Sequence, residues 1–252
     1  MRIVSWNILQ GGGRRCSAIL DTLAQLDADV VALQEYRHGR TSRQLLAGFS
    51  DLGFDNQLLP EPEGSTDGNR TTSPGSINTV GLLSRYPIDG KVLLPAGVDR
   101  VDAPLALRAT ITIIDKDVVD IDLVVVHLPH KRKQLPYFET LLGLPADMRA
   151  AHSLLIGDFN CGIPFEDSET KSFPATRQFQ TLLSQGWVDA WRRRNPQTRE
   201  FTWISSRKGN GFRYDHALVS SAFDKRIRDV RYEHSPREQG ISDHSVLVID
   251  ID

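Results

Sequence analysis

The sequence has little cysteine and no long apolar segment. Only Cys16 and Cys161 occur among 252 residues, which excludes a disulfide framework, and clustered cysteine and histidine at zinc-binding spacing is also missing. No segment approaches the ~20 consecutive apolar residues that a bilayer-spanning helix needs. The opening residues MRIVSWNI show neither the basic part nor the apolar part of a secretory leader. We therefore expect a cytoplasmic protein without membrane attachment.

An excess of either charge is missing as well. The chain has 30 Lys and Arg residues against 32 Asp and Glu residues. This balance excludes a histone-like polycation but leaves nucleic-acid binding open, because the local distribution of charge decides that. The glycine run at 11–13 lacks the G-x-x-x-x-G-K-[ST] pattern, which excludes a P-loop nucleotide site. No repeat and no linker divides the chain, so we predict a single domain over residues 1–252.

Short apolar segments rich in β-branched residues recur along the chain and predict strands. They lie at residues 3–4, 30–31, 80–83, 105–114, 121–126, 154–156 and 246–251. Several are continuously apolar, as expected of strands covered on both faces. Apolar residues repeat with helical spacing over residues 16–27 and again from Phe179 to Leu183. The pattern predicts an α/β fold in which helices cover a sheet, with a turn-rich loop at 60–76.

Polar side chains stand at the ends of these predicted strands. They are Asn7, Glu35, His127, Asp158, Asn160, Asp215, Asp243 and His244. Strand ends are where a rigid scaffold presents side chains to a site. Any one of these residues could instead be a turn residue, a helix cap or a solvated edge. The ordered set, however, favours a common site.

These residue types suit phosphodiester hydrolysis. Carboxylates such as Glu35 and Asp243 are hard ligands that suit Mg²⁺, for which Mn²⁺ can substitute. The Asp158 carboxylate can orient and deprotonate a water molecule for attack on phosphorus. An imidazole held by a carboxylate, as His244 could be by Asp215, can donate hydrogen bonds to the phosphate.

The order and spacing of these motifs resemble the endonuclease/exonuclease/phosphatase superfamily. The similarity covers essentially the whole chain and rests on Ser5-Trp6-Asn7, Leu33-Gln34-Glu35, Gly157-Asp158-Phe159-Asn160, Arg213-Tyr214-Asp215 and Ser242-Asp243-His244. The resemblance implies a four-layer α/β sandwich, in which two mixed sheets pack face to face with helices outside. The metal ligands that it implies are Glu35, Asn7 and Asp243. The catalytic residues that it implies are Asp158 as the water-activating base, Asn160 on the phosphate, the pair His244 and Asp215, Asn7 and His127.

Within this superfamily, the segment from Phe179 to Ser220 resembles the exonuclease III and abasic-site endonuclease branch most closely. Aromatic residues near its end line the pocket for a flipped abasic sugar in that branch, which implies substrate contacts for Trp203 and Phe212. Both residues could equally pack in a core. The segment from Val126 to His130 departs from that branch, because its His-Leu pair is more similar to deoxyribonuclease I and the phosphoesterases.

Basic residues cluster close in sequence to the polar strand ends. Residues 190–213 hold seven basic residues, among them Arg192 and Arg213, and one acidic residue. Further clusters lie at Lys131–Lys133 and at Arg14–Arg15. On the rim of the site they would contact backbone phosphates, although charge runs are commonly solvated faces. We therefore predict double-stranded DNA as the partner of a monomeric protein.

The leading hypothesis is a Mg²⁺-dependent DNA nuclease of the exonuclease III type, which cuts at abasic sites or resects 3′ ends. The alternative is a phosphoesterase of the same superfamily that acts on a small or lipid phosphate, and His127-Leu128 favours it. A non-catalytic binding module is the third hypothesis. It is disfavoured because such relatives typically lose site residues, and here every one is in place.

Overall fold

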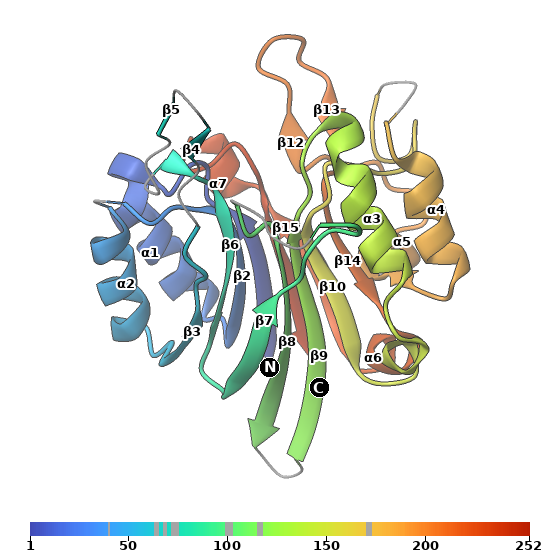
Figure 1. Ribbon diagram of the computed structural model, residues 1–252, viewed down its shortest axis with the longest axis horizontal. Helices are drawn as coiled ribbons and strands as arrows, with labels where there is room; N and C mark the ends of the chain where they lie inside the picture. Colours follow the sequence, from blue (N-terminus) through green and yellow to red (C-terminus); the bar gives the residue numbers. More distant parts are fainter. Residues whose placement is uncertain are drawn as a thin grey trace.

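The computed structural model describes residues 1–39, 41–62, 66–67, 70–71, 76–98, 103–114, 118–169 and 173–252. Two six-stranded sheets lie face to face at its centre (Figure 1). The order of the first sheet is β15 (Ile227–Glu233), β16 (Val246–Ile251), β1 (Arg2–Asn7), β2 (Val30–Tyr36), β6 (Thr79–Ser84) and β3 (Asn56–Leu58). The order of the second is β11 (Val188–Asp189), β14 (Asp215–Val219), β10 (Ser153–Asp158), β9 (Val118–His127), β8 (Ala106–Ile114) and β7 (Ile88–Val92). Both sheets are mixed, because each contains parallel and antiparallel neighbours.

Helices cover the outer faces of both sheets (Figure 1). The first sheet carries α1 (Cys16–Leu26) and α2 (Ser42–Asp51), and the second carries α3 (Leu135–Leu142) and α4 (Thr176–Ser184). Shorter helical segments are η1 (Gly13–Arg15), η3 (Lys131–Gln134), η4 (Ala146–Arg149), α5 (Ala190–Arg194), α6 (Ser221–Asp224) and α7 (Ser235–Glu238). The predicted four-layer α/β sandwich is therefore confirmed.

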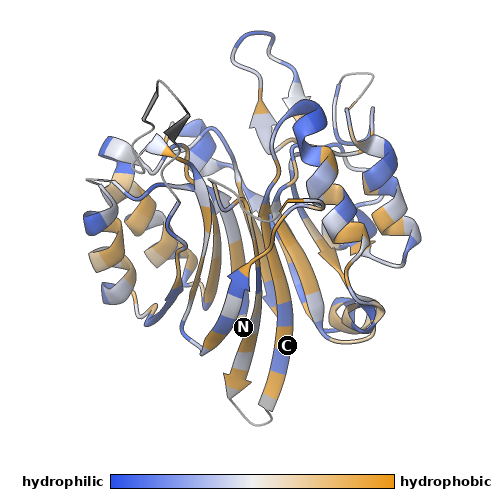
Figure 2. Cartoon of the chain, viewed as in Figure 1, coloured by the Kyte–Doolittle hydropathy of each residue, from blue (hydrophilic) through white to orange (hydrophobic). Residues whose placement is uncertain are grey.

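Side chains alternate along the central strands between two kinds of core. Ile3 on β1 and Leu154 on β10 are buried between the sheets. Their neighbours point the other way, so that Val4 packs with the residues of α1 and α2, and Leu155 packs with those of α3 and α4. Hydrophobic residues consequently concentrate in the strands and on the inner sides of the helices, as Figure 2 shows. Coverage on both faces explains why these strands are continuously apolar.

Two parallel strand pairs carry the polar strand ends at Asn7, Glu35, His127 and Asp158. β1 pairs in parallel with β2, and β9 pairs in parallel with β10. Each pair is connected through a helix, α1 and α3 respectively, because a parallel connection must return to the starting end of the sheet. The register places Asn7 opposite Gln34, and His127 opposite Asp158. Since the Asn7 side chain hydrogen-bonds to Asp158, both pairs end in the same region.

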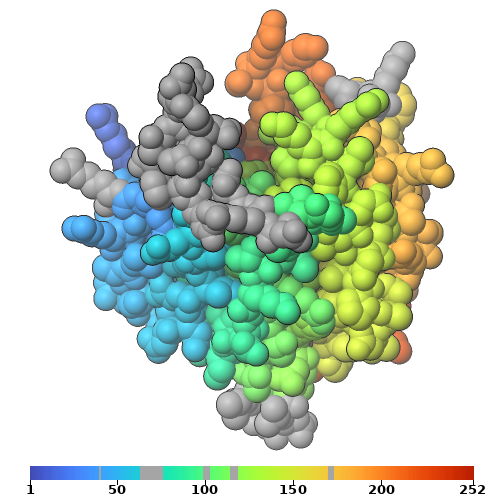
Figure 3. All heavy atoms as spheres, in the orientation of Figure 1, coloured from blue at the N-terminus to red at the C-terminus, as the bar shows by residue number. Residues whose placement is uncertain are grey.

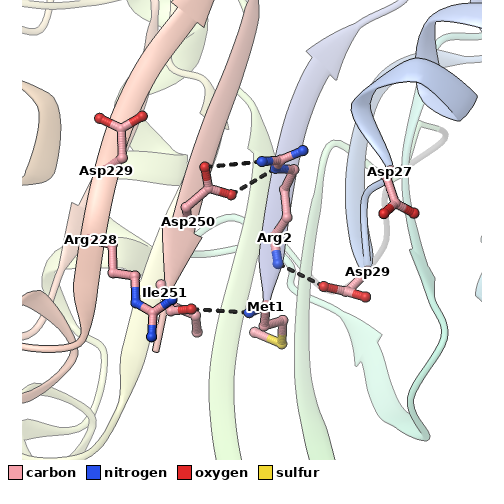
Figure 4. Close-up of a pocket in the computed structure, with 8 residues that line it drawn as sticks. All are labelled: Met1, Arg2, Asp27, Asp29, Arg228, Asp229, Asp250 and Ile251. Carbon is pink, nitrogen blue, oxygen red and sulfur yellow. Dashed lines mark hydrogen bonds and ion pairs between the residues drawn. The ribbon is translucent and has the colours of Figure 1, made fainter.

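The opposite end of β1 carries a second group of charged residues (Figure 4). Here the Met1 amino group donates to the Ile251 carbonyl at 3.0 Å, and Arg2 Nε lies 2.7 Å from Asp250 Oδ1. The Arg2 backbone N–H donates to Asp29 at 2.7 Å. These bonds surround a hollow of about 460 Å³ and tie the first and last strands together.

Most sequence predictions of secondary structure are confirmed. Each apolar segment that predicts a strand overlaps one. The helix predicted over residues 16–27 ends at Leu26, because Asp27 adopts a left-handed conformation with φ of 46° that closes the helix. The loop predicted at 60–76 falls largely outside the described residues, although within it β4 (Thr66–Asp67) pairs with β5 (Arg70–Thr71). None of the helices in the described part of the chain has the length and apolar character that crossing a bilayer requires.

Candidate active site

Polar side chains from both sheets meet at one end of the space between the sheets. On β10, Ile156 faces the other sheet, and strand alternation puts Asp158 on the same face. On β9, Val125 does the same, so His127 follows it onto that face. We refer to the polar residues that meet here as the strand-end cluster, which comprises Asn7, Glu35, His127, Asp158, Asp215 and His244.

Glu35 reaches the strand-end cluster through an irregularity in β2. Strict alternation would place it with Leu33 on the helix-covered face. The pairing with β6 shifts in register between Leu33 and Tyr36, and Glu35 has φ of 59°. A bulge of this kind re-aims a side chain. The Glu35 carboxylate therefore accepts hydrogen bonds from the Asn7 side chain at 3.3 Å and from the Gln10 backbone N–H at 2.8 Å.

The Asn7 amide stands between two carboxylates. Its Nδ2 donates to Glu35 Oε1 at 3.3 Å and to Asp158 Oδ2 at 3.1 Å. Its Oδ1 accepts a hydrogen bond from the Leu9 backbone N–H at 3.0 Å, which fixes the orientation of the amide. Asn7 therefore links the two sheets and separates two acidic groups that would otherwise repel each other.

Two imidazoles flank the Asp158 carboxylate. His127 Nε2 and His244 Nε2 each lie 3.7 Å from Asp158 Oδ2. His127 Nε2 is also 4.0 Å from Glu35 Oε1, and its Nδ1 is buried with no hydrogen-bond partner among the described residues. His244 Nδ1 lies 2.9 Å from Asp215 Oδ2. The structure thus places together the His244 and Asp215 side chains that the resemblance pairs.

Burial and charge set the protonation of the strand-end cluster. Burial raises the pKa of Asp158 to about 7. Burial lowers the pKa of His244, but the carboxylates of Asp215 and Asp158 outweigh this effect and raise it to about 10. Burial also lowers the pKa of His127 to about 4. At neutral pH the cluster therefore combines a carboxyl group whose pKa lies near neutrality, a charged imidazole and a neutral imidazole.

Close strand packing and a tight turn hold Asp158 in place. Gly157 has φ of 140°, and a Cβ atom there would lie 2.0 Å from the Val126 carbonyl oxygen, so only glycine permits this approach. After the strand, the Asn160 backbone N–H donates to Asp158 Oδ1 at 2.9 Å, which is an Asx-turn. The Asn160 side chain donates to the Leu128 carbonyl at 2.8 Å. Asn160 is thus both a turn residue and a neighbour of the cluster.

The carboxylates of this region suit a divalent cation. Asp243 Oδ1 and Asp215 Oδ1 are buried and have no hydrogen-bond partner in the described part of the chain. Atoms of Asp158, Asp215 and His244 lie within 4.8 Å of one another, a spacing that can hold a metal ion. His244 would have to lose its proton to act as a ligand, because a metal needs a free lone pair on the imidazole. Glu35 and Asp243 offer the hard oxygen atoms that Mg²⁺ prefers.

Aromatic rings gather on a projecting hairpin. β12 (Trp203–Ile204) pairs with β13 (Gly211–Phe212), and the loop between them rises from the end of the molecule (Figure 1). The ring centroids of Trp203 and Phe212 are 5.7 Å apart, and Phe212 stacks on Tyr214 at 5.0 Å. Trp203 and Phe212 are half-buried, so they pack together and still keep surface. Their predicted contact with substrate stays a prediction.

Arg213 is buried and Arg192 is half-buried, and both are bonded within one network, which corrects the predicted contact of Arg213 with substrate. Arg213 is 1% exposed, and its guanidinium donates to Asp167 at 2.8 Å and to Asp189 at 2.7 Å. Arg192 donates to Asp167 at 3.1 Å and to three backbone carbonyls. With these bonds made and its side chain buried, the Arg213 guanidinium is not free for a phosphate, whereas the predicted contact of Arg192 stays a prediction. We refer to this network as the arginine cluster, which comprises Asp167, Asp189, Arg192, Arg213 and His216.

A hollow of about 740 Å³ opens beside Glu35 and His127. Its lining includes Arg37, Lys131 and Lys133, and the two lysines are exposed. The basic segment at 131–133 therefore lies beside the strand-end cluster, as predicted. Arg37 is a further lining residue that sequence reasoning missed, although its place just after the Glu35 strand end is a usable signal.

The two remaining basic clusters divide between structural and exposed residues. The Arg15 side chain donates to the backbone carbonyls of Leu9 and Ile241, so it anchors η1 to its neighbours. Within residues 190–213, the exposed cations include Arg207 and Lys208 at the tip of the hairpin. Charge that can meet a polyanion is therefore found at the hairpin tip as well as beside the hollow.

Comparisons with known proteins agree with this architecture. A model of the endonuclease/exonuclease/phosphatase family matches residues 4–244, whereas no curated protein matches the chain. The fold is similar to that of an AP endonuclease from Archaeoglobus fulgidus, with 21% identity, a TM-score of 0.79 and coverage of 100% of this chain and 99% of that chain. It is also similar to the 3′-5′ exonuclease NExo from Neisseria meningitidis, with 23% identity, a TM-score of 0.79 and complete coverage of both chains. The chain belongs to the endonuclease/exonuclease/phosphatase family.

Proposed function

We propose that the protein is a divalent-metal-dependent phosphodiesterase that cuts nucleic acid, of the exonuclease III and abasic-site endonuclease type. The observation that carries the proposal is the environment of Asp158, a buried carboxyl group with a pKa of about 7 that lies 3.7 Å from two imidazoles. We further propose that residues 1–252 form one domain that acts as a monomer.

Asp158 acts as the general base in this proposal. A base is most effective when its pKa lies near the working pH, because it is then both ionised and able to hold a proton. The Asn7 amide donates to one Asp158 oxygen and the Asn160 backbone N–H donates to the other, so both oxygens are oriented. Asp158 takes the proton of a water molecule as that water attacks phosphorus.

The two imidazoles have different tasks. His244 is charged at neutral pH because its Nδ1 faces Asp215, which leaves Nε2–H to donate to the charge that develops on the phosphate. His127 is neutral at neutral pH, because burial lowers its pKa to about 4. We assign it to contact with the scissile phosphate or the leaving oxygen, beside Glu35.

Glu35 and Asp243 would hold the metal, and Asn7 would assist them by its hydrogen bond to Glu35. Support comes from the bulge that turns Glu35 into the cluster and from Asp243 Oδ1, which is buried and has no hydrogen-bond partner among the described residues. When bound, Mg²⁺ or Mn²⁺ would supply positive charge against the phosphate oxygens.

Exposed cations favour a polyanionic substrate, which we propose to be double-stranded DNA. They lie at Lys131–Lys133 and at Arg207 and Lys208 on the hairpin tip. Both segments project at the same end of the molecule, in light green and orange (Figure 3). Such residues bind backbone phosphates without regard to sequence. One structural relative of 23% identity is the 3′ phosphatase NExo from Neisseria, bound to a product DNA hairpin.

A phosphoesterase that acts on a small or lipid phosphate is the second candidate. The hollow of about 740 Å³ beside Glu35 and His127 favours it, because this volume lies in the range of small-ligand pockets. A small substrate would not need the charges on the hairpin tip, so the response to changes there separates the two candidates.

The test is cleavage of an end-labelled duplex with one central abasic site, beside an undamaged duplex and a chromogenic small phosphodiester. Each substrate is incubated with Mg²⁺, with Mn²⁺ and with EDTA, using the wild-type protein and Asp158→Asn. We expect metal-dependent incision of DNA by the wild-type protein only. The double variant Arg207→Ala/Lys208→Ala should weaken the action on DNA and spare the small diester.

The other outcomes are equally informative. Turnover of the small diester with both duplexes intact would establish the second candidate over the first. A folded protein without activity on any substrate would contradict both enzymatic proposals. It would favour the non-catalytic binding module if DNA binding were also unchanged in Asp158→Asn.

A further inference from the structure

Thr202, the residue just before β12, connects two of the strand ends that form the site. The Thr202 carbonyl accepts a hydrogen bond from the Ser245 backbone N–H at 2.9 Å, just after His244. The Thr202 hydroxyl accepts bonds from the backbone N–H groups of Tyr214 and Asp215, at 3.0 Å and 3.3 Å. The base of the hairpin therefore bridges the chain segments that carry Asp215 and His244.

Trp203, the next residue, reaches the carboxylate of Asp243. Its indole Nε1 donates to Asp243 Oδ2 at 3.0 Å, and its backbone forms an isolated β-bridge with His244. The other oxygen of this carboxylate, Oδ1, is buried and has no hydrogen-bond partner among the described residues. One oxygen is thus fixed by the indole, and the other is left for a ligand that the protein itself does not supply.

The indole N–H can be separated from the rest of the Trp203 ring. The ring packs against Phe212 and Tyr214, with centroids 5.7 Å and 5.6 Å away, and this packing does not need the nitrogen. The hydrogen bond to Asp243 needs only the nitrogen. A Trp203→Phe change therefore removes the bond and keeps an aromatic ring in the hairpin base.

We propose that Trp203 is a positioning residue for the metal: its indole N–H orients the Asp243 carboxylate and connects the aromatic hairpin to the metal site. The inference rests on the proposed function, in which Asp243 is a metal ligand. Hydrogen-bond donors that hold a ligating carboxylate commonly set the affinity of a metal site. The Trp203 indole N–H and the metal are then energetically coupled, so a change that removes this hydrogen bond changes metal binding.

The experiment measures Mn²⁺ binding to the DNA-free protein, from the electron paramagnetic resonance signal of free Mn²⁺ during titration. Trp203→Phe should raise the Mn²⁺ dissociation constant by about 10-fold, the lower end of the range for loss of such a partner. Phe212→Leu is the matched control, because it disturbs the same ring cluster without touching Asp243, and it should leave the constant unchanged. Thermal unfolding of each variant confirms that it is folded.

A double-mutant cycle tests whether the effect of Trp203 on the metal acts through its hydrogen bond to Asp243. In an Asp243→Asn background, Trp203→Phe should have no further effect on Mn²⁺ affinity, because the carboxylate that it orients is gone. An unchanged dissociation constant for Trp203→Phe alone, while Asp243→Asn weakens binding, would overturn the role of Trp203 and leave the metal assignment standing. If Asp243→Asn itself leaves Mn²⁺ affinity unchanged, the metal assignment fails, and the inference fails with it.

Discussion

The strand-end cluster and the arginine cluster both contain buried carboxylates, and their electrostatics are opposite. In the arginine cluster, Arg213 lies 2.6 Å from Asp167 and 2.7 Å from Asp189. Burial alone would raise the pKa of both carboxyl groups, but the guanidinium charge holds them below their usual range. In the strand-end cluster, the ion pairs described for Asp158 are with histidines and not with an arginine, and its pKa rises to about 7.

This difference separates carboxylates that hold the fold from carboxylates that are available to a ligand. A carboxylate paired with a buried arginine is neutralised within the protein, and breaking the pair is costly. Asp158 lacks such a partner, and Asp215 and Asp243 each keep a buried oxygen without a partner in the described residues. Carboxylates of this second kind occur at functional sites, where substrate, metal or proton completes them.

The largest expected effect is on catalysis and concerns the strand-end cluster, in which Asp158 is not paired with any arginine that the structure describes. Asp158→Asn keeps the shape of the side chain but cannot take a proton, so we expect kcat to fall by about 1,000-fold, within the range for general base catalysis. DNA binding should stay near the wild-type level, because the cations that contact DNA are unchanged. Single-turnover cleavage and equilibrium binding of the same duplex measure the two quantities. Wild-type kcat in this variant would show that Asp158 is not the base.

The second expected effect is on stability and concerns the arginine cluster, in which Arg213 neutralises the buried carboxylates. Arg213→Met removes the charge that neutralises Asp167 and Asp189, and breaking a buried pair in this way costs about 3–5 kcal/mol in the free energy of unfolding. Urea denaturation measures it. Arg207→Met is the control, since Arg207 is exposed and such a change usually stays within about 0.5 kcal/mol. Equal stability of the two variants would show that the arginine cluster does not stabilise the fold more than an exposed arginine does.

The third expected effect is a pH dependence of opposite sign in the two clusters. The folded-state pKa of Asp158, about 7, lies above the unfolded value of about 3.9, so its contribution to stability is lost as pH rises from 4 to 7. The depressed pKa values of Asp167 and Asp189 act the other way: their contribution is present above about pH 4 and is lost as pH falls.

Thermal unfolding in EDTA from pH 4 to pH 7 tests this prediction. Asp158→Asn should gain Tm relative to the wild-type protein as pH rises, by about 2–4 °C for each kcal/mol of penalty removed in a chain of this size. A difference in Tm that is constant across this range would contradict the raised pKa of Asp158. The loss of stability that we expect from Asp167 and Asp189 below about pH 4 would be unaffected by that result, because it depends on different carboxyl groups.

The smallest expected effect is at the far end of β1, where carboxylate and arginine pair closer to solvent (Figure 4). The side chains of Arg2 and Asp250 are 31% and 24% exposed. Water and salt screen such a pair, so Asp250→Asn should cost about 1 kcal/mol or less, and less still at high salt. Urea denaturation at low and high salt measures this. A loss as large as that for Arg213→Met would show that burial does not set the strength of these pairs.

The apolar pattern of the amino-acid sequence by itself indicated strands layered with helices, the resemblance of its motifs implied the four layers, and the pattern also set the place of most of the strand-end cluster. Continuous apolar segments indicated strands covered on both faces, and both sheets contain them. Asp158 and His127 directly continue their strands, and Asp215 begins one, so alternation with a period of two puts all three on the inner face. Both features depend only on neighbours a few residues away along the chain.

The tertiary structure alone decided the partners of Arg213, the entry of Glu35 into the site and the bond of Trp203 to Asp243. The motif Arg213-Tyr214-Asp215 does not show whether the Arg213 side chain faces water or the interior. Its partners Asp167 and Asp189 lie 46 and 24 residues away along the chain. Glu35 enters the site because pairing with β6 introduces a bulge. The bond from Trp203 to Asp243 spans 40 residues. Such contacts form only when the sheets, turns and hairpin pack together, and no local periodicity encodes them.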